Sequence, residues 1–498
     1  MKKFFYLLFS ALIFAFSTIS LVGCSSNEVE KASKNLTKYS VIMALDDEKK
    51  ILSGKEKVSF VNATGKTLDY VCFHLYPRAF RKDAMIKPYT SLTYASCFPN
   101  GESFGDIEIK KVFVANKEAS FKLVGEDEDI LKIDFGFNLD AKKIVEIIIE
   151  FLIQIPNSTH RFGFYDGNVN LGNWYPVVCE FIDGEFDMTP YYSIGDPFCS
   201  SVANYYVEFL FPQKYSLCST GTFDIENIGD QKKAKITAKA VRDFAMCLSE
   251  NAGVVTSKIN NTKVTYMGKA DDEDLNKFLE LSKKAIEYFS KIFGEYPYSS
   301  LSVVKTPFVY GGMEYPNIVF VSNSIDDETE FLKVIVHEIA HQWWYGVVGN
   351  NETQEAWLDE SLSEYSTALF FKHNTGFGVQ YNDIVRDALS SYLLYVDVIE
   401  TIRGDVNTKM NLKISEYKND YEYSYMVYVK GVIMFDSLSN VVGENKVIAG
   451  LKKYYKKNKF KIATKKDFYS AFKSACHKDL EGFFEGYLNG STIITNIN

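Results

Sequence analysis

The sequence contains little histidine and no excess of positive charge. Only 6 of its 498 residues are histidine, and 64 acidic residues outnumber 55 basic ones, which gives a formal net charge of -9. Nucleic-acid-binding proteins typically carry a basic surface, so this balance argues against a nucleic-acid partner. Low-complexity disorder is excluded as the main state because 46% of the residues are hydrophobic and 15% are aromatic.

The cysteines form no metal-binding or redox motif. Seven of them follow Cys24, and no two are arranged as CxxC. An odd number without close pairs indicates neither a complete set of disulfides nor a thiolate zinc site, and buried free thiols are the simpler interpretation. The chain after residue 23 also lacks an apolar run long enough to cross a bilayer, and it shows no internal repeat.

The first 23 residues resemble an export signal. Two lysines precede an apolar run from 4 to 16, and LVGC at 21–24 resembles the bacterial lipobox. We therefore predict a lipoprotein signal peptide at 1–23, a lipid anchor on the thiol of Cys24 and a polar tether at 24–38. The alternative is an ordinary secretory signal or a signal anchor with an incidental cysteine. The lipid anchor would hold the protein outside the cytoplasm, on the bacterial cell membrane.

The hydrophobic periodicity changes near residue 254. Before this point, several stretches alternate or run apolar and β-branched between turn residues, which predicts a β-rich domain at 39–254. After it, helical spacing at 272–293 and 327–344 predicts two helices, and 300–308 and 317–322 are typical of strands. The glycine-led segment between those strands is expected to be a loop, and further helices are expected from about residue 357 onward.

HEIAHQWW at 337–344 places two histidines on one face of a predicted helix. His337 and His341 are four residues apart, so their side chains point the same way and can bind one metal ion. Glu338 lies about 100° further round the helix, close enough to hold a water molecule on that ion without being a ligand. Helical histidine pairs that only cap or face solvent are common, so the pentad by itself is only suggestive.

A third ligand is needed, because hydrolytic zinc sites use three protein ligands and one open position. Eighteen residues, 342–359, separate His341 from Glu360 in WLDES at 357–361. This interval fits a turn back to a second helix that presents a carboxylate. Two histidines and a glutamate suit Zn²⁺ better than they suit thiolate-preferring or all-oxygen ions. The alternative is that Glu360 and Glu364 are acids on a solvated helix face.

These motifs together resemble the M1 family of zinc aminopeptidases, which belongs to the gluzincins. HEIAH, eighteen residues and a glutamate are similar to the family's zinc signature, GGMEY at 311–315 is similar to its G-x-M-E-N loop, and YVKG at 428–431 is similar to its Y-x-K-G segment. The resemblance implies an α+β multidomain fold. A thermolysin-like zinc peptidase domain at 255–440 would follow the β-rich domain, with a C-terminal helical extension at 441–498.

The resemblance also implies the metal site and the reaction. His337, His341 and Glu360 would bind one Zn²⁺ per chain, and Glu338 would be the general base. Tyr428 would donate a hydrogen bond to the developing oxyanion. Because 421–431 holds four tyrosines, Tyr428 could instead belong to a core or surface aromatic stripe.

Four further residues are implied to contact the substrate. Glu314 would bind the free α-amine, beside Gly312 and Met313 of the same motif, and Tyr423 would line the first side-chain pocket. The alternative for Glu314 is a plain surface acid after a glycine turn.

The implied activity is removal of N-terminal residues from peptides by metal-activated water attack, with peptides bearing a free N-terminus as partners. Two rival functions are an endopeptidase on the same scaffold and a catalytically inactive surface binding module.

The sequence departs from the family pattern at three points. Tyr315 replaces the usual asparagine of the loop and is expected to reshape the cleft near the leaving side. Asp359 and Ser361 replace the asparagine and glycine of WLNEG. The acid of the N-terminal domain that assists amine binding in many members has no convincing counterpart before Trp174.

Overall fold

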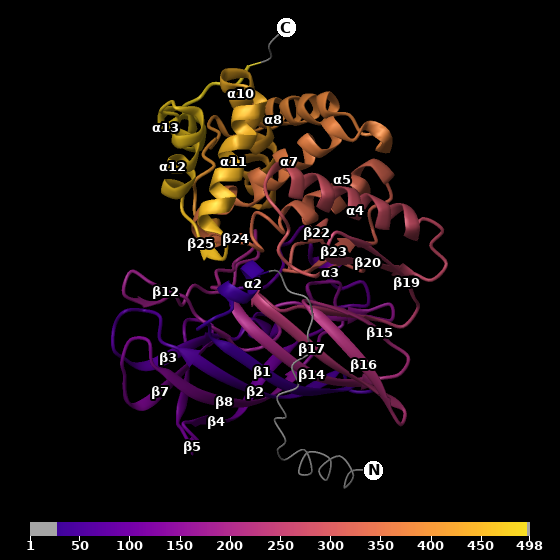
Figure 1. Cartoon of the computed structure of the whole chain (residues 1–498), viewed down its shortest axis with the longest axis vertical. Helices are drawn as coiled ribbons and strands as arrows, with labels where there is room; N and C mark the ends of the chain where they lie inside the picture. Colours follow the sequence, from indigo (N-terminus) through magenta and orange to yellow (C-terminus); the bar gives the residue numbers. More distant parts are fainter. Residues whose placement is uncertain (1–26, 496–498) are drawn as a thin grey trace.

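The strands of the first half of the chain and the helices of the second half lie at opposite ends of the computed structural model, which describes residues 27–495 (Figure 1). This arrangement confirms the predicted fold class, a β-rich N-terminal domain followed by an α+β part that ends in helices. The predicted signal peptide and Cys24 lie outside the described residues, so the lipid anchor stays a prediction. No helix within 27–495 is long and apolar enough to cross a membrane.

An eight-stranded sheet is the largest element of the N-terminal domain. In β2 every second side chain is buried, as expected for a sheet with one face on the core. Strand β1 pairs parallel with β14 and antiparallel with β2. The spatial order is β16 (Thr222–Ile228), β17 (Gln231–Val241), β14 (Ala203–Pro212), β1 (Lys38–Asp46), β2 (Ile51–Val61), β8 (Ile144–Gln154), β4 (Asp106–Val114) and β5 (Lys117–Glu118).

Smaller sheets and short helices complete this domain. One four-stranded sheet has the order β15 (Ser216–Ser219), β18 (Met246–Ser249), β10 (Asn168–Leu171) and β9 (Phe162–Tyr165), and another has β11 (Val177–Val178), β3 (Leu68–His74), β7 (Ile130–Leu139) and β6 (Phe121–Val124). The remaining elements are α2 (Asn27–Ala32), η1 (Tyr76–Phe80), α3 (Tyr94–Cys97) and the hairpin β12 (Phe181–Ile182) and β13 (Glu185–Phe186). The seven cysteines of the described residues are free and buried, as expected.

A five-stranded sheet begins the second half of the chain. Its order is β19 (Ala252–Ile259), β20 (Thr262–Lys269), β21 (Ser300–Thr306), β23 (Ile318–Ser322) and β22 (Gly312–Met313). The predicted boundary between 254 and 255 falls inside β19. Strand β22 lies in the segment expected to be a loop. It is the last strand at one edge of the sheet, and it pairs antiparallel with β23.

Two helices pack on this sheet and on each other, α4 (Leu275–Ile292) and α5 (Glu328–Ala340). Helix α5 begins where the side chain of Asp327 accepts a hydrogen bond from the Glu330 N–H, a common N-cap. It ends at Ala340 rather than at residue 344 as predicted, because the N–H groups of Trp343 and Trp344 bond to the Ala340 carbonyl and form a turn.

The helices after α5 form the upper part of the molecule in Figure 1. They are α6 (Glu352–Glu355), η2 (Ala356–Leu358), α7 (Glu360–His373), η3 (Thr375–Phe377), α8 (Tyr381–Arg403), η4 (Ile414–Glu416), α9 (Asp420–Tyr423), the π-helix η5 (Ser424–Val429), α10 (Lys430–Val442), α11 (Glu444–Asn458), α12 (Lys465–Cys476) and α13 (Glu481–Leu488). Two short parallel strands, β24 (Val348–Gly349) and β25 (Lys461–Ile462), connect the segment after α5 to the segment after α11.

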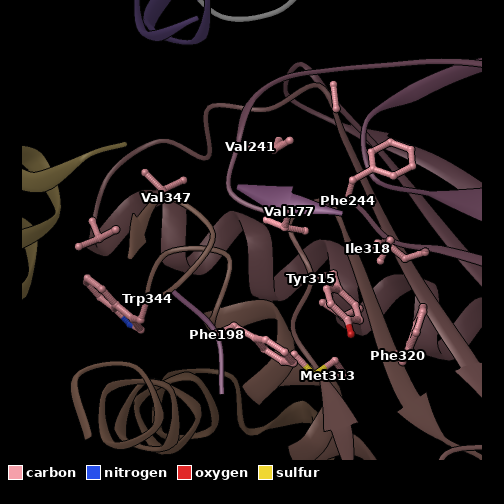
Figure 2. Packing of buried hydrophobic residues seen from close by; sticks show 14 of the residues in the cluster. Val177, Phe198, Val241, Phe244, Met313, Tyr315, Ile318, Phe320, Trp344 and Val347 are labelled. Atoms are coloured by element: carbon pink, nitrogen blue, oxygen red, sulfur yellow. The ribbon is translucent and has the colours of Figure 1, made fainter. Parts of the chain in front are cut away.

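A buried apolar cluster joins the two halves of the molecule. Figure 2 shows Phe198 and Phe244 of the N-terminal domain in one cluster with Met313 and Tyr315. The Tyr315 hydroxyl donates a 2.6 Å hydrogen bond to the side-chain oxygen of Asn173. Tyr315 is fully buried and points into this interface, so the expectation that it would reshape the cleft near the leaving side is wrong.

One buried arginine also connects the halves. Arg242 follows β17, is 1% exposed, and donates to the backbone carbonyls of Tyr345 at 2.9 Å, Lys461 at 3.1 Å and Ser200 at 2.5 Å. Its guanidinium occupies the space beside Gly349, where an added Cβ would lie 2.2 Å from Cζ. Carbonyls left buried without a donor are costly, so Arg242 is a main stabilising contact between three distant segments.

We predict that Arg242→Ala lowers the free energy of unfolding by about 3–5 kcal/mol, because it takes the donor from the buried carbonyls of Tyr345 and Ser200 and opens a cavity. Urea denaturation followed by intrinsic fluorescence measures the change. Lys235→Ala is the control, since it removes only a surface ion pair with Glu226 and should change the unfolding free energy by less than about 1 kcal/mol. Equal stability of the two variants would contradict this role of Arg242.

Candidate metal centre and active site

Three predicted ligand side chains meet at one point between α5 and α7. The Nε2 atoms of His337 and His341 are 2.9 Å apart, and each lies 3.2 Å from the same carboxylate oxygen of Glu360. A tetrahedral zinc site with bonds of about 2.0–2.1 Å has ligand atoms about 3.3 Å apart. The spacing and the donor set therefore fit a zinc ion, and these three residues are one of the groups able to hold a metal.

The turn after α5 fixes the orientation of His341. Its Nδ1 lies 3.0 Å from the Trp344 carbonyl, so the ring donates there and leaves the Nε2 lone pair for the metal. Both indoles of the turn are buried: Trp343 donates to the Gly294 carbonyl and Trp344 donates to the Ser366 hydroxyl, each at 2.9 Å. Trp343 and Trp344 thus hold the turn that contains the Trp344 carbonyl, and this carbonyl orients the imidazole of His341.

Glu338 lies beside the triad with one carboxylate oxygen buried and without a hydrogen-bond partner. Burial raises the pKa of Glu338 to about 7, although the two neighbouring imidazoles lower it. The carboxylate packs against Gly312, where an added Cβ would lie 2.2 Å from Oε1. Glycine in the GGMEY motif therefore provides the space that the glutamate occupies.

Glu314 directly follows β22, and its side chain is buried, with 3% exposed. Burial and the negative charges of Asp196 and Glu338 raise the pKa of Glu314 well above its usual value, and its Oε1 has no hydrogen-bond partner. Carboxylate oxygens of Asp196, Glu314 and Glu360 lie within 4.8 Å of one another. The side chain of Gln342 donates to the Tyr315 carbonyl at 3.1 Å, which ties this segment to the helix of the histidines.

Arg161 positions the acid contributed by the N-terminal domain. It is 4% exposed, and its Nη1 contacts the Asp196 carboxylate at 2.6 Å and the Met313 sulfur at 3.1 Å. Met313 is thus a contact of the arginine and is itself buried. Asp196 was not predicted from the sequence, because it lies in a coil segment far from the motifs and no local pattern marks it.

Tyr428 lies on the π-helix η5 and reaches the metal centre. Its hydroxyl donates to Oε1 of Glu360, and its ring stacks on His337 with centroids 5.8 Å apart. The backbone around it is held by Ser361, whose hydroxyl donates to the Val427 carbonyl at 2.6 Å. Gly431 of the YVKG motif allows this approach, since an added Cβ would lie 2.4 Å from the Ser361 oxygen.

Tyr423 lines the same cavity, which has a volume of about 530 Å³ and includes the triad, Glu314, Glu338 and Tyr428. The Tyr423 ring meets Tyr428 edge-on at 5.8 Å. Its tip touches Gly195, where an added Cβ would lie 2.9 Å from the hydroxyl. All of the site residues predicted from the motifs therefore come together, Gly312 and Met313 as contacts of other site residues, whereas Cys24 lies outside the described residues.

Comparison with known proteins gives a family for this part of the chain. The family model described as "Peptidase family M1 domain" matches residues 278–487. Leucine aminopeptidase 2 of Chaetomium globosum is 25% identical over 244 residues, 47% of this chain and 38% of that protein. Leukotriene A-4 hydrolase of Xenopus laevis is 29% identical over 204 residues, 39% of this chain and 32% of that protein. The matches thus span about a third of each relative's own length.

A solved structure is similar over nearly the whole chain. It is a mutant M1 zinc metallopeptidase from Deinococcus radiodurans bound to a Tyr-Ser-Ala substrate, with a TM-score of 0.63, 13% identity, and coverage of 92% of this chain and 94% of that one. At this identity the likeness shows the fold. Residues 278–487, which the M1 family model matches, contain the His337–His341–Glu360 triad.

Proposed function

We propose that this protein is a zinc aminopeptidase that removes N-terminal residues from peptides. The observation that carries the proposal is the buried, partnerless carboxylate oxygen of Glu314 in the same cavity as the triad. A fixed anion there favours a substrate ammonium group at a set distance from the metal. The tripeptide bound by the similar Deinococcus radiodurans protein supports peptides as the substrate class.

The ion would be held by His337, His341 and Glu360. When bound, it would act as a Lewis acid on the scissile carbonyl and lower the pKa of a water molecule toward neutrality. Glu364 would support this binding: its Oε1 lies 3.1 Å from Nδ1 of His337, on the side of the ring away from the triad. A carboxylate in that position makes an imidazole a better metal ligand.

Two further side chains would move or stabilise charge during hydrolysis. Glu338 would accept a proton from the attacking water and deliver it to the leaving amine, a role that needs a carboxylate held close to both. Tyr428 would donate its hydroxyl hydrogen to the oxyanion that develops on the substrate. Such a donor contributes most in a site from which water is excluded, and both side chains line the cavity.

Recognition of the N-terminus would depend on Glu314 and Asp196 together. The two acids come from different halves of the chain, and Arg161 balances only the charge of Asp196. A substrate α-ammonium between them would supply the missing positive charge. A mid-chain amide is neutral and would leave Glu314 buried without a counter-charge, which is unfavourable. The geometry therefore favours an exopeptidase over the endopeptidase alternative.

We predict that Glu364→Gln weakens zinc binding about 10–100-fold, because the neutral amide no longer polarises His337. Competition with a chromogenic zinc chelator measures the dissociation constant. Glu330→Gln is the control, since Glu330 is exposed and pairs with Lys333 at 2.5 Å away from the ligands. Unchanged zinc affinity in Glu364→Gln would refute the supporting role.

Blocking the N-terminus separates the three candidate functions. The purified full chain with zinc should release the first residue of a free peptide and leave the N-acetylated peptide intact, as measured by mass spectrometry of the products. Glu338→Gln should lower the rate about 10²–10⁴-fold while keeping its zinc. Cleavage of the acetylated peptide would instead support an endopeptidase, and a chain without turnover of either peptide would support an inactive binding module.

Tyr428→Phe should lower kcat about 10²–10³-fold with little change in KM, because the lost hydroxyl acts only on the oxyanion of the transition state. Steady-state hydrolysis of an aminoacyl coumarin amide measures both constants, and metal analysis checks that zinc remains. A variant that loses zinc, or one with full kcat, would show that the hydroxyl serves Glu360 rather than the reaction.

A further inference from the structure

The carboxylate of Glu314 is held mainly through the backbone that carries it, because its buried oxygen Oε1 has no hydrogen-bond partner. Gln342 fixes that backbone from one side: its side chain accepts a 2.9 Å hydrogen bond from the Asn317 N–H and donates to the Tyr315 carbonyl. The side chain of Tyr315, which directly follows Glu314 in the chain, fixes the backbone from another side.

The Tyr315 hydroxyl contacts one end of a β-hairpin of the N-terminal domain. Its acceptor, Asn173, lies two residues after strand β10. Gly172 leaves room for the tyrosine ring, since an added Cβ would lie 2.0 Å from the hydroxyl oxygen. Asn173 has a φ of 49°, in the left-handed region that asparagine adopts more readily than most residues. Glycine and asparagine at these two positions thus allow the hydroxyl to reach the amide.

A buried aspartate determines which way the amide of Asn173 faces. Nδ2 of Asn173 donates to Oδ2 of Asp243 at 2.9 Å, and Oδ1 of Asp243 accepts from the Phe244 N–H at 2.7 Å. An ionised carboxylate only accepts hydrogen bonds. The amide therefore turns its NH₂ group toward Asp243 and its oxygen toward the hydroxyl of Tyr315.

The same end of the hairpin also holds the second acid of the proposed amine site. Arg161 directly precedes strand β9, and its carbonyl accepts a 2.8 Å hydrogen bond from the Gly172 N–H. The guanidinium of Arg161 contacts Asp196. This hairpin end is thus connected to Asp196 on one side and, through the hydroxyl of Tyr315, to Glu314 on the other.

We propose that Asn173 is a positioning residue for the amine site, because it holds the hydroxyl of Tyr315 and so fixes the carboxylate of Glu314; this inference rests on the proposed aminopeptidase function. Asp243 takes part by orienting the amide of Asn173. Neither Asn173 nor Asp243 is among the described residues that line the cavity, so both act through Tyr315. Such positioning matters, since a displacement of about 1 Å can cost about 10²-fold in rate.

The other possible role of the bond between Tyr315 and Asn173 is to stabilise the interface between the two halves. A bond with only that role would change the free energy of unfolding and leave recognition of an amine unchanged. The contribution of the amine to binding therefore distinguishes the two roles. Leucine hydroxamate and 4-methylpentanohydroxamate measure it, because both can bind zinc through the hydroxamate and they differ only in the α-amino group.

Isothermal titration calorimetry of the zinc-loaded full chain gives both dissociation constants. We expect the unaltered protein to bind leucine hydroxamate about 10–100-fold more tightly than the analogue without the amine, the range of a hydrogen bond to a charged group. Tyr315→Phe should bring this ratio at least about 5-fold closer to one, because Glu314 is no longer held in place. The affinity for the analogue should change by less than about 3-fold, since the zinc ligands come from α5 and α7.

Asp243→Asn is the second variant, and it should lower the same ratio. The double variant should lose no more than Tyr315→Phe alone, because both changes act through one hydroxyl. Tyr298→Phe is the matched control. The buried hydroxyl of Tyr298 also reaches from the second half of the chain to the N-terminal domain, where it donates to the Ala240 carbonyl at 2.7 Å. Its loss should lower stability and leave the ratio unchanged.

The outcomes separate this inference from the proposed function. An unchanged ratio in folded Tyr315→Phe, or an equal fall in Tyr298→Phe, would overturn the positioning role and leave the proposed function standing. If either Tyr315→Phe or Asp243→Asn fails to fold, the other decides. Equal binding of the two hydroxamates by the unaltered protein would reject the amine site itself, and with it the basis of the proposed function.

Discussion

The concentration of buried carboxylates around the triad is the constraint on which the rest of the site depends. Five of them, Glu314, Glu338, Glu352, Asp359 and Glu360, are each 5% exposed or less. Such groups are stable in a protein interior only with protons or counter-charges. Although burial opposes it, the charges of the two imidazoles lower the pKa of Glu360 to about 2, and Glu314 has no such partner. A divalent ion and a substrate ammonium group would each supply positive charge where the protein itself lacks it.

Apolar packing holds these mutually repelling groups together. The buried indoles after α5 fix the turn that orients His341, so the ligand geometry does not depend on the metal alone. Two glycines set the closest approaches: one beside Glu338 and one beside Ser361. At either position a methyl group would overlap a side chain of the site. The motif glycines thus act by leaving space, and neither has a positive φ angle.

Sequence reasoning succeeded where the determinant was local. The spacing of His337 and His341 on one helix, and the interval to Glu360, were enough to predict the triad that the fold assembles. Asp196 could not be predicted because only tertiary packing brings it to the site, and Tyr315 was misjudged because its partner, Asn173, lies in the other domain. Glu364 lies one turn after Glu360, and this helical spacing could be read from the sequence. The sequence could not show whether its side chain contacts His337 or faces solvent.

Metal binding and the proposed binding of the substrate amine depend on different parts of the fold. The triad comes from α5 and α7, which pack directly on each other within one half of the molecule. The proposed amine site pairs Glu314 with Asp196, so it combines residues from the two halves. A small rotation between the halves would therefore change substrate binding while leaving the metal ligands in place. Interface contacts such as those of Arg242, which lies outside the cavity lining, would therefore affect the proposed substrate binding.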